Sequence, residues 1–410
     1  MRSFEVTHGQ LVRLCAALCA DELARSFGRY VESLTQSSWG AKTPLGPGGA
    51  DLTREQAAAC ARRASIFFGQ PEDALTPAEG DLFGDWADAL AGMIRRELVA
   101  FRFHPATHGG VADTRHPADE VYQDARAVAG LMQGRRRAVS LIATAGLMGW
   151  VAAVLAPNLQ RLEVMDARPL TPDELAEALR FGDVVIATPT LWRYLADTLP
   201  AVPDNVVGIS YGEALGPDLA GRLRGRGLGG MRELYGSTET GVVGWRDSPQ
   251  EPFVLFDHWR REGEALVRQR PGGGTHPTLA MDALDWRGER SFALGGRRDG
   301  AVQIAGVNVF PRKIGEVIAG HEATQSCTVR LSQRPGALDR LIAHVTLRPG
   351  RSADQALAWS VDEWCRKRLQ PPERPRIYTF QEAGQERGQE TGQAPGPVSG
   401  QEAGSAGADG

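Results

Sequence analysis

Lysine is almost absent from this chain of 410 residues. Lysine and arginine together number 46, and only Lys42, Lys313 and Lys367 are lysines. A mechanism that requires an ammonium group therefore has very few candidates. Arginine offers charge to a phosphate, but a guanidinium does not reproduce the compact charge of an ammonium.

Cysteine, charge of one sign and long apolar runs are also scarce. The five cysteines are scattered without the paired spacing of a metal site, so we expect buried free thiols. A formal net charge of -4 provides no electrostatic attraction to nucleic acid or to an anionic membrane. No stretch approaches about eighteen consecutive apolar residues, and the N-terminus lacks a signal-peptide pattern. We expect a soluble, cytoplasmic protein with a small-molecule partner and no nucleic-acid or membrane partner.

The chain is long enough for two or more domains, and its patterns change along its length. Apolar residues at helical spacing predict helices at 11–27, 54–68 and 86–98. From 99 to about 224, short strands and helices alternate, which is typical of a parallel sheet covered on both faces. Beyond 245 we expect further strands, and after 300 a compact α+β segment.

The stretch 235–241, Tyr-Gly-Ser-Thr-Glu-Thr-Gly, is the strongest functional signal, and a predicted strand at 231–234 leads into it. Small residues, hydroxyl groups and the carboxylate of Glu239 are the groups that bring backbone amides and a Mg²⁺-attracting oxygen to a nucleotide phosphate. The alternative is a structural turn in which glycine supplies the special dihedral angles.

Two further loops lie where a phosphate could bind. A small-residue loop at 104–113 separates a predicted strand at 99–103 from a predicted helix at 117–132, and a second turn covers 211–213. Ligands of parallel sheets gather at the carboxyl ends of the strands, so we expect both loops and the turn at 235–241 to meet there.

These residues, together with a second stretch at 294–311, resemble the adenylate-forming superfamily of acyl-CoA synthetases and aryl-acid AMP ligases, in particular the shorter bacterial ligases of secondary metabolism. The resemblance runs from about residue 62 to residue 378. It implies an α/β fold, in which a large N-terminal domain (1–297) has a parallel sheet flanked by helices and a strand-rich subdomain. A small C-terminal α+β lid domain (298–380) would follow, and then a disordered tail (381–410), because the tail has too few apolar residues to offset its ordering entropy.

The Tyr-Gly-x-Thr-Glu signature of this family is matched by the stretch at 235–239. The resemblance implies that Thr238 contacts the α-phosphate of ATP and that Glu239 holds Mg²⁺. It also implies that the backbone of Tyr235 borders the adenine, with Gly236 in the same nucleotide-binding segment.

Other positions match the nucleotide site of the family. Asp282 falls where the family has an aspartate that binds the ribose hydroxyls, although a turn residue is the alternative. Arg297 and Asp299 match a Gly-Arg-x-Asp hinge, which implies that Arg297 reaches the ribose and that Asp299 marks the pivot of the lid. The turn that resembles the adenine-stacking turn of the family consists of Tyr211, Gly212 and Glu213.

The resemblance implies a two-step reaction. A small carboxylic acid attacks the α-phosphate of ATP, which leaves an acyl-adenylate and pyrophosphate. The lid then rotates, and a thiol of CoA or of a phosphopantetheine group on an acyl carrier protein takes the acyl group. Positioning and charge neutralisation provide the catalysis, with Mg²⁺ and cationic side chains offsetting the charge on the phosphates.

The lysines that the family has at its catalytic positions are absent from this sequence. Its phosphate loop ends in Pro-Lys, whereas 104–112 retains only Thr107 and Gly109, and Ala112 stands where the lysine belongs. Gln303 replaces the lysine after the hinge, and no lysine follows Lys367. Gly146 occupies an aromatic or histidine position of the family.

Arg115 and the histidines at 104, 108 and 116 lie near the loop and are candidates to contact phosphate. For Arg115 the alternative is a solvated residue at the start of a helix, and the histidines lack the paired spacing of a metal site. Trp150, Trp192 and Tyr194 are candidates for the acid pocket.

Three hypotheses remain open from the sequence. The first is a working ligase with rearranged cation chemistry that activates an aryl or short acyl acid. The second is a catalytically degenerate member that keeps the fold and a nucleotide pocket and acts as a binding or scaffold partner. The third is a protein that carries out one half-reaction, such as thioester transfer.

Overall fold

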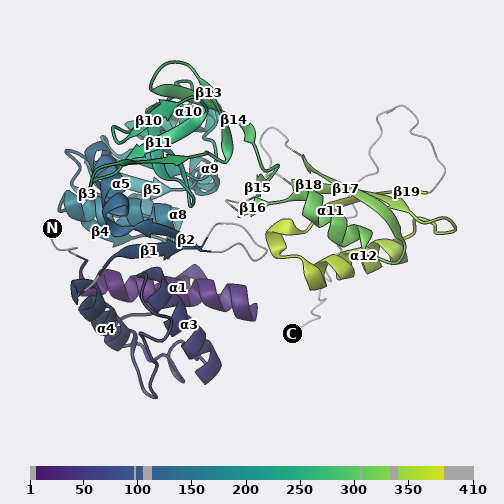
Figure 1. Ribbon diagram of the computed structural model, residues 1–410, viewed down its shortest axis with the longest axis horizontal. Coiled ribbons are helices and arrows are strands. Elements are labelled where there is room, and N and C mark those ends of the chain that lie inside the picture. The colour runs from purple at the N-terminus through teal and green to yellow at the C-terminus, as the bar shows by residue number, and fades with distance from the viewer. Residues whose placement is uncertain (1–5, 97, 105–112, 305–306, 333–339, 383–410) are drawn as a thin grey trace, which may run out of the picture.

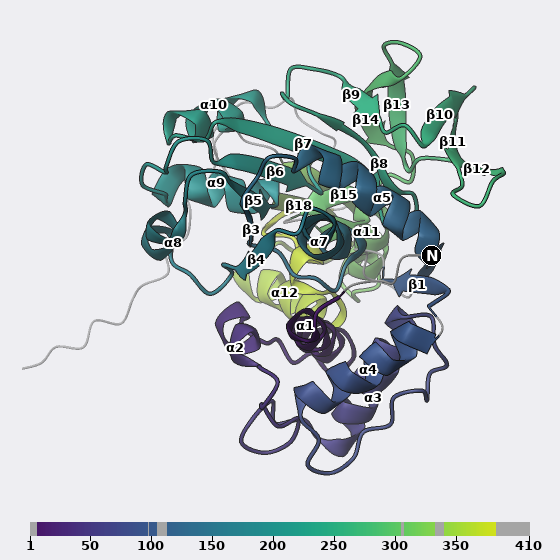
Figure 2. The same ribbon diagram turned by 90° about the vertical axis from the view of Figure 1, so that its left-hand side faces the viewer.

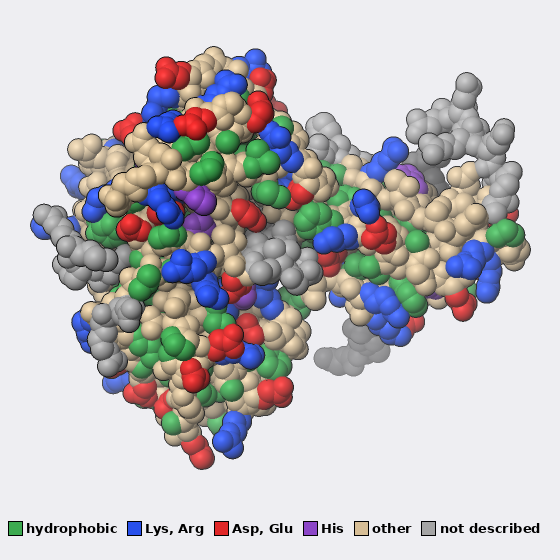
Figure 3. Space-filling model, viewed as in Figure 1, with side chains coloured by type: hydrophobic (Ala, Val, Ile, Leu, Met, Phe, Trp, Pro, Cys, Tyr) green, Lys and Arg blue, Asp and Glu red, His purple; other side chains and the backbone are tan. Residues whose placement is uncertain are grey.

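A computed structural model of the protein describes residues 6–96, 98–104, 113–304, 307–332 and 340–382. Figure 1 shows a large body, with helices α1, α3 and α4 as a layer at one end, and a smaller lobe that contains the C-terminal elements. The lobe stands off from the body, and a constriction separates the two in the space-filling view (Figure 3).

The helices follow the predicted positions closely. Those of the body are α1 (His8–Phe27), α2 (Ser33–Ser38), α3 (Arg54–Phe67), α4 (Phe83–Arg96), α5 (Ala118–Leu131), α6 (Leu147–Trp150), the π-helical η1 (Val151–Leu155), α7 (Ala156–Leu159), α8 (Pro172–Ala178), α9 (Pro189–Thr198) and α10 (Pro217–Gly225). Those of the lobe are α11 (Pro311–Ala319), α12 (Gln355–Arg368) and the 3₁₀ turn η2 (Pro371–Glu373).

In the described part of the chain the strands belong to five separate sheets. Those before residue 240 are β1 (Ala100–Phe103), β2 (Thr114–Pro117), β3 (Arg137–Ser140), β4 (Glu163–Asp166), β5 (Asp183–Ala187), β6 (Val207–Tyr211) and β7 (Gly230–Ser237). Those that complete the body are β8 (Gly241–Arg246), β9 (Phe253–Leu255), β10 (Trp259–Glu262), β11 (Ala265–Gln269), β12 (Thr275–Thr278), β13 (Asp282–Trp286) and β14 (Ser291–Arg297). The lobe contains β15 (Val302–Ile304), β16 (Val307–Val309), β17 (Thr324–Ser332), β18 (Arg340–Leu347) and β19 (Ile377–Gln381).

The central sheet has nine strands in the order β13-β14-β9-β8-β7-β6-β5-β3-β4. The strands from β4 to β7 pair in parallel, as the alternation of strands and helices predicts. From β7 onward the pairing is antiparallel, and β8, β9, β14 and β13 extend the same sheet. The α/β prediction is confirmed, and the sheet is mixed because β7 returns through a hairpin.

Helices cover both faces of the parallel strands (Figure 2). Successive side chains of a strand point to opposite faces. Accordingly Val184 and Ile186 pack in the cluster that includes α5 and α7, whereas Val185 and Ala187 pack with α8, α9 and α10. Every residue of β5 is buried, as expected for a strand covered on both sides.

Glycine is required where β6 meets α9. A Cβ atom at Gly208 would collide with the side chains of Met231 and Trp192. Trp192 therefore fills the space above β6 and is a core residue rather than a residue of an open pocket.

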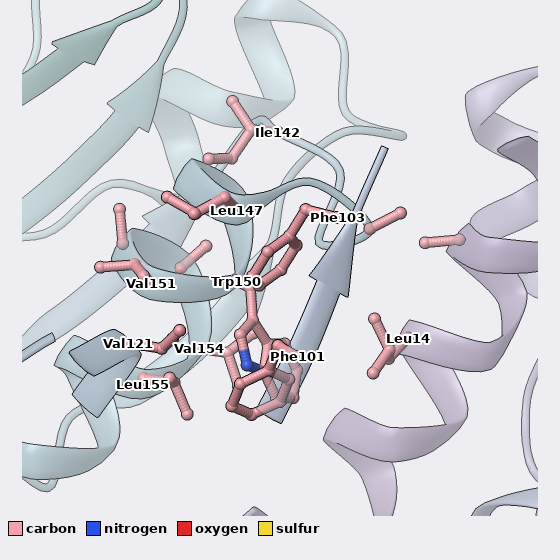
Figure 4. Packing of buried hydrophobic residues seen from close by; sticks show 14 of the residues in the cluster. Leu14, Phe101, Phe103, Val121, Ile142, Leu147, Trp150, Val151, Val154 and Leu155 are labelled. Carbon is pink, nitrogen blue, oxygen red and sulfur yellow. The ribbon is translucent and has the colours of Figure 1, made fainter. Parts of the chain in front are cut away.

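Aromatic rings fill the space between α3, β1 and α6 (Figure 4). Phe67 makes edge contacts with Phe101, Phe103 and Trp150 at centroid distances of 5.8, 5.3 and 5.5 Å. All four rings are fully buried, so Trp150 is also a core residue. Tyr194, the third aromatic residue proposed for the acid pocket, is exposed.

The lobe has a hydrophobic core of its own. Residues of α11 and α12 pack against β17 and β18, and β18 pairs in parallel with β19. On the surface, the hydroxyl of Tyr30 in the body donates a hydrogen bond of 3.0 Å to Gln370 of the lobe. Residues 383–410, most of the predicted tail, lie outside the described residues.

Some predictions at this level are wrong. A strand was expected at 278–281, but β12 ends at Thr278 and β13 begins at Asp282. The helix α2 and the strands β2, β8, β10, β13, β16 and β19 were not expected. All five cysteines are free thiols, as predicted, and all but Cys327 are buried. Within the described part of the chain, no helix combines the length and the apolar character that a membrane crossing requires.

Truncation of Phe67 to alanine should lower the free energy of unfolding of the body by about 3–5 kcal/mol, because the change leaves a cavity between four packed rings. The matched change Phe181→Ala removes a ring that is 52% exposed and should cost less than about 1 kcal/mol. Denaturant titration of both variants measures the difference. Equal losses would contradict the view that this aromatic cluster is a principal source of stability.

Candidate active site

The stretch 235–241 forms a hairpin rather than a loop that follows a strand. β7 continues to Ser237, the turn covers residues 238–240, and β8 begins at Gly241 with a φ of 80°. The Ser237 hydroxyl accepts hydrogen bonds of 3.2 Å from the backbone N–H groups of Glu239 and Thr240. Ser237 therefore stabilises the turn, and the expected end of the strand at 234 is three residues too early.

Asp282 lies beside this hairpin although it is 47 residues away in sequence. The phenol of Tyr235 donates a hydrogen bond of 2.9 Å to Oδ2 of Asp282. Burial and the adjacent Asp282 carboxylate raise the pKa of Tyr235, so the phenol stays protonated and donates. The resemblance assigned a role only to the Tyr235 backbone, so the contribution of its side chain was missed.

Arg297 lies where the two signature stretches meet. It is opposite Asp282 in the β13–β14 ladder, and its guanidinium donates two hydrogen bonds, of 2.9 and 2.7 Å, to Asp299. Burial lowers the pKa of Arg297, but Asp299, Asp282 and Glu239 together raise the pKa above its ordinary value. The same bond to Arg297 is the main cause that lowers the pKa of Asp299. The negative charges of Glu239 and Asp282 therefore both favour the charged form of the Arg297 guanidinium.

The carboxylate of Glu239 has no hydrogen bond or ion pair with the residues that the structure describes. Most other carboxylates nearby are engaged: Asp299 with Arg297, and Asp282 with Tyr235. An unpaired carboxylate at a turn is chemically suited to a hard cation such as Mg²⁺, which prefers oxygen ligands.

The predicted adenine turn follows β6. Tyr211 pairs with Leu234 of β7, so the turn lies next to the hairpin at the carboxyl edge of the sheet. Gly212 has a φ of 101°, which glycine adopts readily. Glu213 forms an ion pair of 2.7 Å with Arg193 and accepts hydrogen bonds of 3.3 Å from Thr190.

A buried glutamate anchors the chain just after this turn. Oε1 of Glu233 accepts a hydrogen bond of 3.0 Å from the backbone N–H of Leu215, while its other oxygen binds Arg246 at 2.6 Å. Burial raises the pKa of Glu233, and Arg246 opposes this shift. Glu233 therefore fixes the adenine turn to β7.

The predicted phosphate loop has a different setting from the one expected. The loop at 104–113 joins the antiparallel strands β1 and β2 instead of leading directly into a helix, so the expected strand-loop-helix unit is wrong. Thr107, Gly109 and Ala112 lie outside the described residues, as does His108. At the base of the loop His104 forms an ion pair with Asp113. Arg115 is exposed on β2 opposite Arg102, rather than at the start of a helix.

His116 of β2 connects this hairpin to the predicted phosphate-binding turn. Its Nε2 atom lies 2.6 Å from the carbonyl oxygen of Thr238, so Nε2 carries the proton and donates it. Burial lowers the pKa of His116, and the bond to Thr238 opposes the shift. His104 and His116 therefore have separate partners.

A cavity of about 660 Å³ lies between the adenine turn and the lobe. Arg193 and Glu213 of the body line it together with Arg340, Arg374 and Arg376 of the lobe. The guanidinium of Arg374 donates to the backbone carbonyl groups of Leu369 and Arg366 and forms no ion pair with the residues that the structure describes. Gln303, which replaces the lysine after the hinge, also lines this cavity. The cavity is strongly positive.

Comparison with known proteins identifies the family. No family model matches the chain. A 4-coumarate–CoA ligase from Halorhodospira halophila is 31% identical over 71% of this chain and 74% of that relative. The chain belongs to the adenylate-forming acyl-CoA synthetases. A second 4-coumarate–CoA ligase, from Cereibacter sphaeroides, is 27% identical over 72% of this chain and 71% of its own length.

A solved structure supports the same fold for this acyl-CoA synthetase-like chain. The amide bond synthetase McbA from Marinactinospora thermotolerans is 16% identical, covers 90% of each chain and has a TM-score of 0.55. By its family, this chain belongs to the class of AMP-forming acid–thiol ligases. It also favours the first hypothesis from the sequence over the scaffold hypothesis.

Replacement of His116 by glutamine should flatten the pH dependence of stability in acid. Because burial lowers the pKa of His116, the unfolded chain binds the proton more readily, and stability is lost as pH falls below about 6.5. The slope contributed by one group is at most about 1.4 kcal/mol per pH unit. Denaturant titrations between pH 7.5 and 5 measure it.

The control is His276→Gln, which changes an exposed histidine of β12 and should leave the slope as in the unsubstituted protein. If His116→Gln retains the full acid slope, the buried histidine is not the group that takes up the proton.

Proposed function

We propose that this protein uses ATP to activate an aryl or short acyl carboxylic acid as the acyl-adenylate and transfers the acyl group to the thiol of CoA. The observation that carries the proposal is the position of Asp282, which lies opposite Arg297 in the β13–β14 ladder and accepts a hydrogen bond from Tyr235 of the hairpin that contains Glu239. These residues come from two distant signature stretches. Family membership supports the same reaction class.

The roles proposed for the side chains follow from their free hydrogen-bonding capacity. Asp282 uses one oxygen for Tyr235 and keeps the other for ribose hydroxyl groups. Thr238 would contact the α-phosphate, and Gly212, where a Cβ atom would meet no neighbour, would leave the surface of the adenine turn open. When bound, Mg²⁺ would offset negative charge on the phosphates, and the unpaired Glu239 carboxylate fits the role of its ligand.

Arg297 matches the arginine of the family's hinge motif, so it does not replace the lysines that the family has elsewhere and that this chain lacks. Arg297 is held in a fixed orientation by Asp299, so its charge is positioned before nucleotide binds. A guanidinium does not reproduce the compact charge of an ammonium, and we therefore propose slower adenylation than in lysine-containing members. The positive cavity beside the adenine turn suits the phosphate groups of CoA. A phosphopantetheine arm presents the same thiol, so an acyl carrier protein is a further candidate acceptor.

Pyrophosphate release with a panel of cinnamates, benzoates and short fatty acids, including 4-coumarate, tests the proposal. The change Glu239→Gln should lower kcat on the order of 10²- to 10³-fold, because the amide cannot neutralise a cation. Glu163→Gln, which alters an exposed carboxylate at the amino end of β4, should leave the rate unchanged. Nucleotide binding without turnover of any acid would overturn the ligase proposal in favour of a binding role.

The two half-reactions can be separated at the cavity. Arg376→Ala should raise the KM for CoA on the order of 10-fold, because a charge-assisted bond to phosphate is lost, and should leave pyrophosphate release without CoA unchanged. Arg312→Ala, which alters an exposed arginine on α11, should change neither value. An equal loss in both half-reactions for Arg376→Ala would rule out a role specific to the acceptor.

A further inference from the structure

A cluster of buried charged and polar side chains lies directly behind the 238–241 turn. Asp124 of α5 is 1% exposed, Arg268 of β11 is 2% exposed, and His258 is 8% exposed. Burial of ionic groups is costly unless every group is paired. No local pattern indicates this cluster, because Asp124 is 134 residues from His258 and 144 residues from Arg268.

The cluster is fully connected internally. Nη2 of Arg268 donates to both carboxylate oxygens of Asp124, at 2.8 and 3.0 Å, and Nε2 of His258 lies 2.9 Å from Oδ1. Nη1 of Arg268 donates to the carbonyl oxygen of Glu120 and to the side chain of Gln123, both at 3.2 Å. The guanidinium therefore has a fixed position and orientation.

Arg268 and Asp124 also form hydrogen bonds with the backbone on either side of Gly241. Arg268 donates a hydrogen bond of 3.2 Å to the carbonyl oxygen of Thr240, and Oδ2 of Asp124 accepts one of 3.0 Å from the N–H of Val242. A Cβ atom at Gly241 would collide with both ionic side chains. Glycine is needed at this position because the ion pair lies against the backbone.

His116 holds the other side of the turn through the carbonyl oxygen of Thr238. The backbone of the turn is thus fixed at residues 238, 240 and 242. The side chains of Thr238 and Glu239 have no hydrogen-bond partner among the described residues. The cluster holds the backbone and leaves both side chains available to a ligand.

Stability alone does not account for such a cluster. Buried ion pairs are often no more stabilising than well-packed apolar residues of similar size, whereas they fix geometry. Functional groups act well only when supporting hydrogen bonds hold them within a fraction of an ångström, and a displacement of about 1 Å can cost on the order of 10²-fold in rate.

We propose that Asp124, His258 and Arg268 are positioning residues that hold Thr238 and Glu239 in the geometry required for the acid to attack the α-phosphate and release pyrophosphate. They act through the backbone of the turn and touch no substrate. The inference rests on the proposed function, since it concerns the same adenylation step. A purely structural cluster would instead join α5 to β8 and β11 without affecting the chemistry.

The change Asp124→Asn tests the proposal, because the amide keeps the shape of the carboxylate but places an NH₂ donor at one of the two oxygen positions that accept from Arg268. It should lower kcat for pyrophosphate release on the order of 10²-fold, with the KM for ATP changed less than about threefold. Rates are compared below the unfolding temperature of each variant.

The matched control is Asp183→Asn. Asp183 is also 1% exposed, and Arg137 donates to its two oxygens at 3.2 and 2.6 Å. This pair lies at the amino edge of β3 and β5, opposite to the proposed site. The control should lower Tm as much as Asp124→Asn does and leave kcat within about threefold. Equal losses of kcat in the two variants, or an unchanged kcat in Asp124→Asn, would overturn the proposal.

A second variant and a second readout cover the remaining outcomes. If Asp124→Asn does not fold, Arg268→Lys replaces it as the test. The lysine keeps a positive charge beside Asp124 but lacks the guanidinium group that also donates to the carbonyl oxygen of Thr240. We again expect a lower kcat with little change in the KM for ATP. Amide hydrogen exchange at Glu239 and Thr240 needs no activity, and it should quicken in Asp124→Asn but not in Asp183→Asn.

The experiments distinguish failure of the proposed ligase function from failure of the positioning role. If the unsubstituted protein releases no pyrophosphate with any acid, the proposed function fails, and amide exchange alone decides whether the cluster fixes the turn. If exchange at Glu239 and Thr240 is the same in both aspartate variants, the positioning role is wrong even when the protein is an active ligase.

Discussion

The reversal of the chain between β7 and β8 is the constraint on which the site depends. β7 is the last parallel strand, and the hairpin at 238–240 returns the chain along its edge as β8. The strands β9, β14 and β13 then extend the same sheet. This extension brings Asp282 to the phenol of Tyr235 and Arg297 to within the electrostatic influence of Glu239. Two signatures that are distant in sequence become neighbours because one sheet changes direction.

Strands and helices with strong local patterns were predictable from the sequence. The helix expected at 54–68 differs from α3 by one residue, the strand expected at 99–103 differs from β1 by one residue, and the helix expected at 11–27 ends where α1 ends. Periodicity of apolar residues determines such elements almost alone. β8 was missed because its two glycines read as a loop, and β2 was missed because it is short and ends in Pro117.

The site was predictable only where a resemblance supplied roles for single positions. Residues such as Glu239 and Asp282 could be named, but the Tyr235 side chain and the partners of the turn could not. Asp124 meets Val242 across 118 residues of sequence, and His116 meets Thr238 across 122. Contacts of this kind are set by tertiary packing and leave no periodic pattern. The scarcity of lysine, by contrast, was visible at once and is consistent with the arginines that line the cavity.

The separate core of the lobe has a mechanical consequence. Among the described residues, Ile314, Val345 and Val361 belong to a cluster whose members all lie between residues 302 and 380, so any reorientation of the lobe would leave this core intact. The hydrogen bond between Tyr30 and Gln370 is a solvent-facing contact that water can replace. Gly300, with a φ of 69°, lies in the short connection after Arg297, in a backbone conformation that glycine adopts readily. A change in the angle between lobe and body would therefore cost connecting dihedral angles and polar contacts rather than the packing of this core.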